Sequence, residues 1–181
     1  MKKIASALCG IIAIGLSCGS YAAIKANTVA LTVGGDGFFF SNKRDLKNSG
    51  GPFVSAMYHF TDHWSLDAML SSFNTNFKPS VDDTRNVNGT SFALDVFYHF
   101  APYFRYPQLQ PYAMIGAGIT GFNHNQYDAN NEGNMNVGLG LQYFVDEVVS
   151  FRFEARDLYT FVGSKNDVLL AAGVTFTIAG C

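Results

Sequence analysis

The stretch that decides the fold is "SFRFEARD", residues 150–157, because its side chains alternate between two kinds of environment. One parity carries apolar side chains and the other carries charges: Phe151, Phe153 and Ala155 against Arg152, Glu154 and Arg156. Successive side chains of a β-strand point to opposite faces of a sheet, so the stretch predicts a strand between two media. Either the aromatic face is a dry core and the charges meet water, or the aromatic face meets lipid and the charges are enclosed.

The N-terminus indicates that the chain is exported. Lys2 and Lys3 precede an uncharged run, residues 4–19, and small residues follow at Ala22 and Ala23. This pattern predicts a secretory signal peptide over residues 1–22 and a mature domain over residues 23–181. The run is shorter than the ~20 apolar residues that a membrane-spanning helix needs.

Composition excludes several classes of function for the mature domain. Cys9 and Cys18 leave with the signal, so Cys181 alone remains, and neither an internal disulfide nor a thiolate metal cluster is expected. Without Lys2 and Lys3, ten Lys and Arg stand against fourteen Asp and Glu with no basic block, so nucleic acid is not an expected partner. We expect no metal and no cofactor. No second apolar stretch could form a spanning helix, so membrane insertion would require a closed barrel.

Turn and loop signals divide the domain into eight strands. Aromatic-flanked turns in 57–69, 97–114 and 141–153 alternate with polar segments at 41–51, 74–90, 123–133 and 163–167. The strands predicted between them are 28–40, 53–60, 64–73, 91–100, 110–122, 134–144, 149–162 and 168–179. Short turns on one side and mostly longer loops on the other are typical of outer-membrane barrels.

Glycines decide which face points outward. The polar face of the predicted strands carries glycine where a water-facing surface would carry Lys and Glu: Gly116, Gly118, Gly138, Gly140 and Gly173. An eight-stranded barrel has room inside only for side chains, so these glycines would make space for the charges of residues 150–157. The sequence therefore predicts an all-β fold, an eight-stranded antiparallel up-and-down transmembrane β-barrel in the bacterial outer membrane. A soluble periplasmic carrier barrel, with its faces reversed, is the alternative.

Residues 27–178 resemble the OmpA-like outer-membrane β-barrel family in its transmembrane domain. The resemblance lies mainly in "NVGLGLQYFVDEVVSFRFEARDLYTF" (136–161) and "NDVLLAAGVTFTI" (166–178). Gly173, Phe176 and Ile178 resemble the C-terminal signal that the barrel assembly machinery recognises, although Ile178 replaces the usual aromatic residue. Larger members add a peptidoglycan-binding domain, and this activity is not carried over to a chain that stops at Cys181. The resemblance implies a role in envelope integrity, with the outer loops contacting lipopolysaccharide, host surfaces or phage.

The charged face predicts an ionic plug inside the barrel. Its expected members are Arg152, Glu154, Arg156, Asp67, Asp95, His59 and His99. Arginine stays charged, so Arg152 and Arg156 need buried carboxylate partners. A narrow porin-like channel for ions or small solutes is the alternative function. Asp157 would face lipid unless a bulge near Arg156 changed the alternation.

An enzyme is not expected. A serine nucleophile needs a nearby activating histidine. The only close candidates are Ser55 and Ser65 beside His59 and His99, near the predicted periplasmic turns, and their geometry is poor for catalysis.

Overall fold

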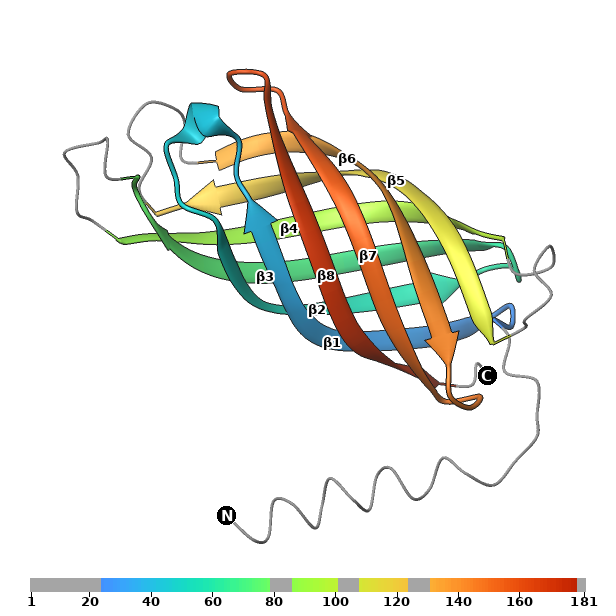
Figure 1. Ribbon diagram of the computed structural model, residues 1–181. Helices are drawn as coiled ribbons and strands as arrows, with labels where there is room; N and C mark the ends of the chain where they lie inside the picture. The colour runs from blue at the N-terminus through green and yellow to red at the C-terminus, as the bar shows by residue number, and fades with distance from the viewer. Residues whose placement is uncertain (1–23, 79–85, 101–107, 124–130, 179–181) are drawn as a thin grey trace, which may run out of the picture.

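Eight antiparallel strands close into one up-and-down barrel in the computed structural model, which describes residues 24–78, 86–100, 108–123 and 131–178 (Figure 1). The strands are β1 (Thr28–Phe39), β2 (Ser49–His59), β3 (Trp64–Asn76), β4 (Asn86–His99), β5 (Leu109–Phe122), β6 (Asn131–Phe144), β7 (Val149–Thr160) and β8 (Lys165–Ile178). Each strand pairs with the next, and β8 pairs with β1. The predicted fold class is confirmed. Among the described residues, no helix is long and apolar enough to cross a membrane.

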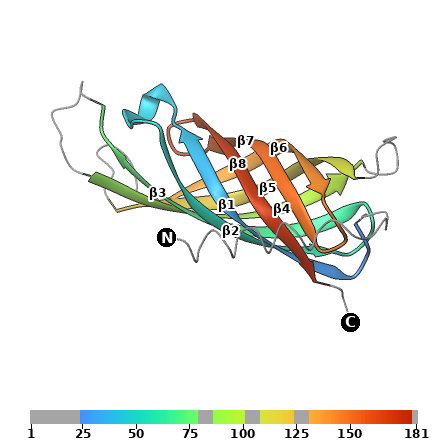
Figure 2. The same cartoon turned by 60° about the horizontal axis from the view of Figure 1, so that its bottom comes forward.

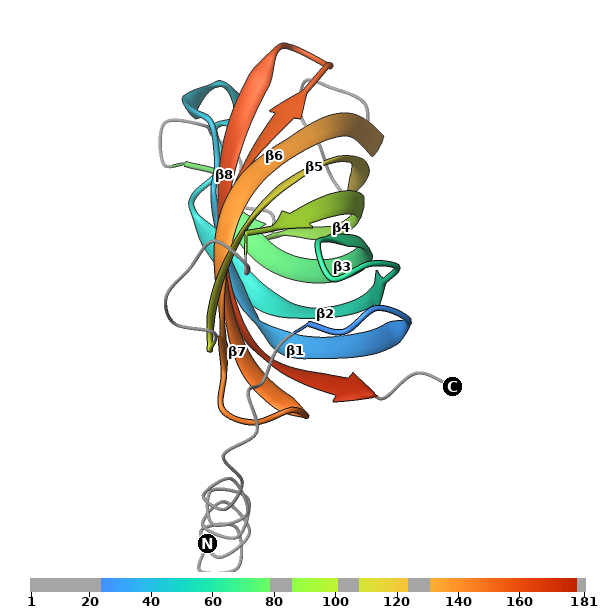
Figure 3. The ribbon, with the colours of Figure 1, turned by 90° about the vertical axis from the view of Figure 1, so that its right-hand side faces the viewer.

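The residue pairing shows how the barrel closes. Starting at Val29 and following paired residues through all eight strands, the path returns to β1 at Phe39, ten residues further along. This stagger tilts the strands around the axis, as Figures 2 and 3 show. An eight-stranded barrel of this kind is just wide enough for side chains to fill its interior.

The apolar face of every strand points outward. Outward side chains 40–66% exposed include Leu31, Val54, Leu66, Leu94, Ile115, Leu139, Phe153 and Leu170, one from each strand. At the end of the barrel that carries the β2–β3 and β6–β7 turns, exposed aromatics follow one another around the wall: Tyr58, Trp64, Tyr143, Phe151 and Phe176. An apolar band bordered by aromatics is the surface of a transmembrane barrel. The reversed orientation of a soluble carrier is therefore wrong.

Several strands run further at the opposite end than the sequence predicts. β2, β4, β6 and β8 begin three to five residues earlier, and β3 ends three residues later. Much of the predicted loop 74–90 is therefore a paired ribbon, in which the Asn74 side chain donates a hydrogen bond to the Asn88 side chain. The polar composition of these segments predicted loops. Backbone pairing does not depend on side-chain polarity, so the strands continue beyond the membrane.

Asp157 faces outward without a bulge. β7 pairs continuously with both neighbours, and Asp157 lies opposite Val137 on β6 and Val168 on β8. The next outward residue along β7 is Tyr159, and the Asn166 amide lies 3.5 Å from an Asp157 oxygen. The carboxylate therefore lies on the lipid-facing wall, near its outer boundary.

Candidate functional site in the barrel lumen

The inward face of β7 carries a charged cluster in the middle of the lumen. Arg152, Glu154 and Arg156 point inward because they are two residues apart on one strand. Arg152 donates to both oxygens of Asp67 on β3, at 3.2 and 3.0 Å, and to Glu154 at 2.8 Å. Arg152 is 1% exposed. Such a two-pronged contact matches the planar guanidinium to the carboxylate.

Arg156 extends the cluster to β4. It donates to Asp95, and to Glu154 at 2.9 Å, and it lies 3.7 Å from Asp67. Glu154 is therefore shared by both arginines. We call Asp67, Asp95, Arg152, Glu154 and Arg156 the middle cluster.

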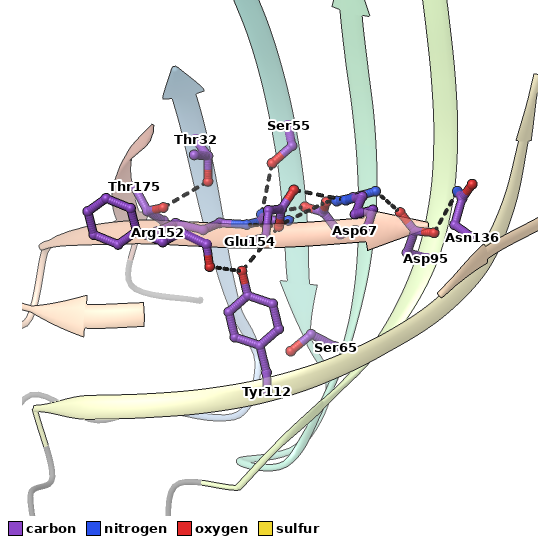
Figure 4. A network of polar contacts seen from close by, with 12 residues as sticks. Thr32, Ser55, Ser65, Asp67, Asp95, Tyr112, Asn136, Arg152, Glu154 and Thr175 are labelled. Carbon is purple, nitrogen blue, oxygen red and sulfur yellow. Dashed lines mark hydrogen bonds and ion pairs between the residues drawn. The ribbon is translucent and has the colours of Figure 1, made fainter. Parts of the chain in front are cut away.

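Neutral groups add hydrogen bonds to the middle cluster. Ser55 accepts from Arg152 at 3.1 Å, Tyr112 donates to Glu154 at 3.1 Å, and Asn136 donates to Asp95 at 3.0 Å. Figure 4 shows these contacts crossing the lumen between strands on opposite walls. The Arg152 guanidinium also lies over the Phe97 ring, 4.9 Å from its centroid. These bonds lower the cost of burying the charges, although Arg156 Nη2 has no hydrogen-bond partner and lies 3.7 Å from an Asp67 oxygen.

The inward glycines make room for neighbours of the arginines. A Cβ at Gly140 would lie 2.1 Å from the Tyr112 ring, and a Cβ at Gly116 would lie 2.2 Å from an Asp95 oxygen. At these two glycines the space is taken by side chains that contact Glu154 and Arg156, whereas the sequence suggested that the charged residues of β7 themselves filled it. At Gly118, Gly138 and Gly173 the nearest atoms are backbone oxygens of the neighbouring strand.

His59 and His99 lie apart from the ion pairs, at the end of the lumen near the β2–β3 turn. The Ser65 oxygen is 2.5 Å from His59 Nδ1 and 2.9 Å from His99 Nε2. All three residues are buried, and Ser65 and His99 are 0% exposed. The structure therefore joins the two histidines through a serine, and no salt bridge to either of them occurs among the described residues.

A second charged cluster, which the sequence analysis missed, closes the outer mouth. Arg44 belongs to a short 3-10 helix, η1 (Asn42–Arg44), and its side chain turns into the barrel. Its guanidinium contacts Asp167 at 2.6 Å, Glu132 at 2.5 Å and Thr160 at 2.9 Å. Lys165 donates to Glu132 at 3.0 Å. We call Arg44, Glu132, Lys165 and Asp167 the mouth cluster.

Further hydrogen bonds hold the segment around η1 against the barrel. The Ser41 amide donates to Asp167 at 2.8 Å, and Lys43 donates to the Ser164 carbonyl at 2.9 Å. On the other side, the Lys47 amide donates to the Asn76 carbonyl at 2.9 Å. In Figure 1, η1 lies at the same end of the barrel as the β7–β8 turn.

An apolar layer separates the two clusters. On β7 the inward order is Arg156, Leu158 and Thr160, and on β8 it is Asp167, Leu169 and Ala171. The buried apolar side chains at this level include Phe38, Phe53, Met69, Phe73, Leu158 and Leu169. The lumen is therefore filled in three successive layers, two charged and one apolar.

The alternation of the extended strands was the signal that could have revealed the mouth cluster. Glu132, Asn134 and Asn136 share one parity of β6, and Lys165, Asp167 and Leu169 share one parity of β8. Continuing the predicted strands by three residues would have placed Glu132, Lys165 and Asp167 inside. Arg44 lies outside any strand, and its inward position has no such signal.

The residues of the expected assembly signal lie at the inner end of β8. Gly173 is on the inward face, while Phe176 and Ile178 point outward and are 42% and 53% exposed. The expected signal peptide, residues 1–22, and Cys181 lie outside the described residues. Within the described part of the chain, no group of three or more His, Cys, Asp and Glu side chains could hold a metal ion.

A closed barrel with an apolar outer wall and a polar, filled interior defines a transmembrane β-barrel protein. The sequence pattern of the family described as "Outer membrane protein beta-barrel domain" matches residues 8–177. The chain belongs to this family and is a protein of the bacterial outer membrane.

Solved structures with the same fold agree with this assignment. The chain is 15% identical to OprG of Pseudomonas aeruginosa, with a TM-score of 0.65, and the similarity covers 88% of this chain and 99% of OprG. It is 22% identical to the N-terminal barrel of Pseudomonas aeruginosa OprF, with a TM-score of 0.58, covering 86% and 100%. It is 14% identical to Ail of Yersinia pestis in complex with the heparin analogue sucrose octasulfate, with a TM-score of 0.58, covering 84% and 99%. No curated protein sequence matches the chain at a significant level.

Proposed function

We propose that this barrel is a structural protein of the outer membrane, which acts through its lipid-facing wall and its outer loops and does not carry solutes through its lumen. The observation that carries the proposal is the filling of the lumen by the middle cluster, the apolar layer and the mouth cluster. An open path along the axis would require both charged clusters to separate and the apolar side chains between them to move aside. Removing one partner of a buried ion pair costs about 3–5 kcal/mol, so separating two clusters is a rare event.

The outer wall supports a role in lipid organisation. Its apolar side chains form a continuous band, and uncharged polar side chains follow above it on β3 and β4, including Ser72, Asn74, Asn88 and Thr90. Such groups can hydrogen-bond the sugar hydroxyls of lipopolysaccharide. Contacts of the outer loops with host surfaces or phage belong to the same proposal. The complex of Ail with a heparin analogue supports it only as a precedent on the same fold.

The inner end of β8 supports delivery by the barrel assembly machinery. Phe176 and Ile178 are outward, exposed and close to the end of the strand. They are therefore accessible to a partner before the barrel closes on β1, and we propose Gly173, Phe176 and Ile178 as the signal.

We further propose that the protein has no catalytic activity. Ser65 lies between two histidines, as an activated nucleophile would, but it is 0% exposed and has no surface that a substrate could reach.

Conductance across planar lipid bilayers tests the closed lumen. We expect wild type and the variants Arg44→Ala and Arg156→Ala to stay closed, since the apolar layer and the other charged cluster still fill the lumen in each single variant. Lys25→Ala is the matched control, because Lys25 is exposed and pairs outside the lumen with Glu147. Steady conductance by wild type, altered by Arg152→Ala or Arg156→Ala, would instead establish the narrow channel.

A deletion strain tests the structural role. Loss of the protein should increase sensitivity to detergents and to large antibiotics that an intact outer membrane excludes, and both wild type and Arg156→Ala should restore resistance. An unchanged barrier combined with slower uptake of small solutes would contradict the proposal.

A further inference from the structure

The middle of the lumen carries more negative charge than its side chains balance. Four buried carboxylates, Asp36, Asp67, Asp95 and Glu154, share this level of the described barrel with two arginines, Arg152 and Arg156. The mouth cluster, by contrast, has two of each sign. An ionised carboxylate away from water is costly unless a cation and hydrogen bonds compensate it. The excess is two negative charges, and a proton bound to one of the four carboxyl groups would reduce it to one.

Asp36 is the one of these four carboxylates that accepts no hydrogen bond from Arg152 or Arg156. Asp67, Asp95 and Glu154 each accept from at least one guanidinium. Asp36 is 9% exposed, and neither of its carboxylate oxygens has a hydrogen-bond partner.

The surroundings of Asp36 are largely apolar. Its paired residues are Gly51 on β2 and Ala171 on β8, and the next inward residue on β1 is Phe38. The buried Ser71 hydroxyl lies nearby and also has no hydrogen-bond partner. The site thus contains an unpaired carboxyl and an unpaired hydroxyl at the boundary between the middle cluster and the apolar layer.

We propose that Asp36 is a proton-binding site: in the folded barrel its carboxyl group is neutral and donates a hydrogen bond to the Ser71 hydroxyl. The proton comes from water when the ionised side chain of the unfolded chain enters the barrel. A metal ion fits the site less well, because cations that bind oxygen take six or more ligands and the described residues offer no such group.

Ionisation of Asp36 would disturb the middle cluster. Arg156 and Glu154 on β7 act on it with opposite sign. Asp67 on β3 and Asp95 on β4 would add repulsion from the same cluster, and Asp167 on β8 from the mouth. The inward residues of β2 near it, Gly51 and Phe53, carry no charge. A negative Asp36 would thus repel Glu154 and compete with Asp95 for Arg156, so the proton keeps the middle cluster intact.

Infrared spectroscopy of the folded full chain in detergent micelles tests the proposal directly. At about pH 5.5, most exposed carboxyl groups are ionised. We expect wild type still to show the C=O stretching band of a protonated carboxyl, and Asp36→Asn to lack it. Glu147→Gln, which changes an exposed carboxylate, should keep the band. Absence of the band in wild type would overturn the proposal, as would a band that survives in Asp36→Asn but disappears in Asp95→Asn.

Thermal stability provides a second measurement that does not depend on the spectrum. Between about pH 4 and pH 6 only the unfolded chain has released the proton, so stability should fall as pH rises through this range. The wild-type unfolding midpoint should drop by about 3 °C for each pH unit in this range more than that of Asp36→Asn. An equal pH dependence in both proteins would overturn the proposal, as would recovery of wild-type stability at high pH by sodium or potassium ions. If Asp36→Asn does not fold, the pH titration of the wild-type band remains decisive.

Discussion

Neighbouring side chains on β7 lie in opposite environments, one on the lipid-facing wall and the next in the buried ionic network. Phe153 is 50% exposed on the outer wall, whereas its neighbours Arg152 and Glu154 are 1% and 6% exposed inside. The same rule accounts for Asp157, which continues the alternation and therefore lies outside. The effect of replacing a carboxylate on stability should therefore depend on whether it lies inside the barrel or on the outer wall.

Replacing Glu154 with glutamine should strongly destabilise the barrel. Glu154 accepts from both arginines and from Tyr112, and a neutral side chain would leave Arg152 with Asp67 and Arg156 with Asp95 as their remaining carboxylate partners. We expect a loss of about 1.5–3 kcal/mol in the free energy of unfolding, the worth of hydrogen bonds to charged groups. Reversible urea unfolding in micelles measures it, with Glu147→Gln as the exposed control. Equal effects of the two substitutions would contradict the proposed role of the ion pairs.

Replacing Asp157 with valine should stabilise the barrel. A carboxylate on the lipid face is unfavourable, but the penalty decreases near the membrane boundary. Asp157 lies near this boundary, since Tyr159 and Asn166 are its outward neighbours. We expect a gain of about 1 kcal/mol in the same unfolding experiment. Ala155→Val, which adds apolar surface without removing charge, is the control. A loss of stability specific to Asp157→Val would indicate that the carboxylate has a partner in the membrane.

The strand ends predicted from the sequence agree with the structure at the inner end of the barrel and differ from it at the outer end. At the inner end the β2–β3 and β6–β7 turns are short, and strand ends agree with the sequence pattern to within a residue or two. At the outer end the strands continue through polar sequence, and η1 folds back into the mouth. The difference arises because inner turns are local structures, while η1 is held by residues far along the chain, such as Asp167.

Removing the Arg44 side chain should release the η1 segment. Its guanidinium joins η1 to β6, β7 and β8, and without it the buried Glu132 and Asp167 would lack that cation. We expect trypsin added to intact cells to cut Arg44→Ala after Lys43 or Lys47 about ten times faster than wild type, because local opening becomes easier. Lys78→Ala removes an exposed contact to Asn42 and should change the rate little. Equal cleavage of all three proteins would show that Arg44 does not hold the segment.

At the scale of the whole molecule, closure of β8 on β1 makes the barrel one cooperative unit. All backbone groups of the strand ladder then find partners, as a protein in lipid requires. A closed barrel of this kind resists detergent until it is heated.

The protein should therefore show heat-dependent migration on a denaturing gel. We expect the band from the outer-membrane fraction to run faster without boiling than after boiling, because the unboiled barrel stays compact. The boiled sample is the internal control. A single position under both conditions, with the protein in the soluble periplasmic fraction, would contradict a membrane barrel.

The sequence by itself determined the strands, their two faces and the set of charges on β7, because alternation along a strand is a local property. "SFRFEARD" and the glycines of β5, β6 and β8 were sufficient to predict an enclosed polar interior. Only the tertiary structure decided which partners those charges take. Arg152 reaches Asp67 across 85 residues of chain, and Arg44 reaches Asp167 across 123. The pairing depends on the stagger at which the barrel closes and on the inward fold of η1, and neither is encoded in the pattern of any single segment.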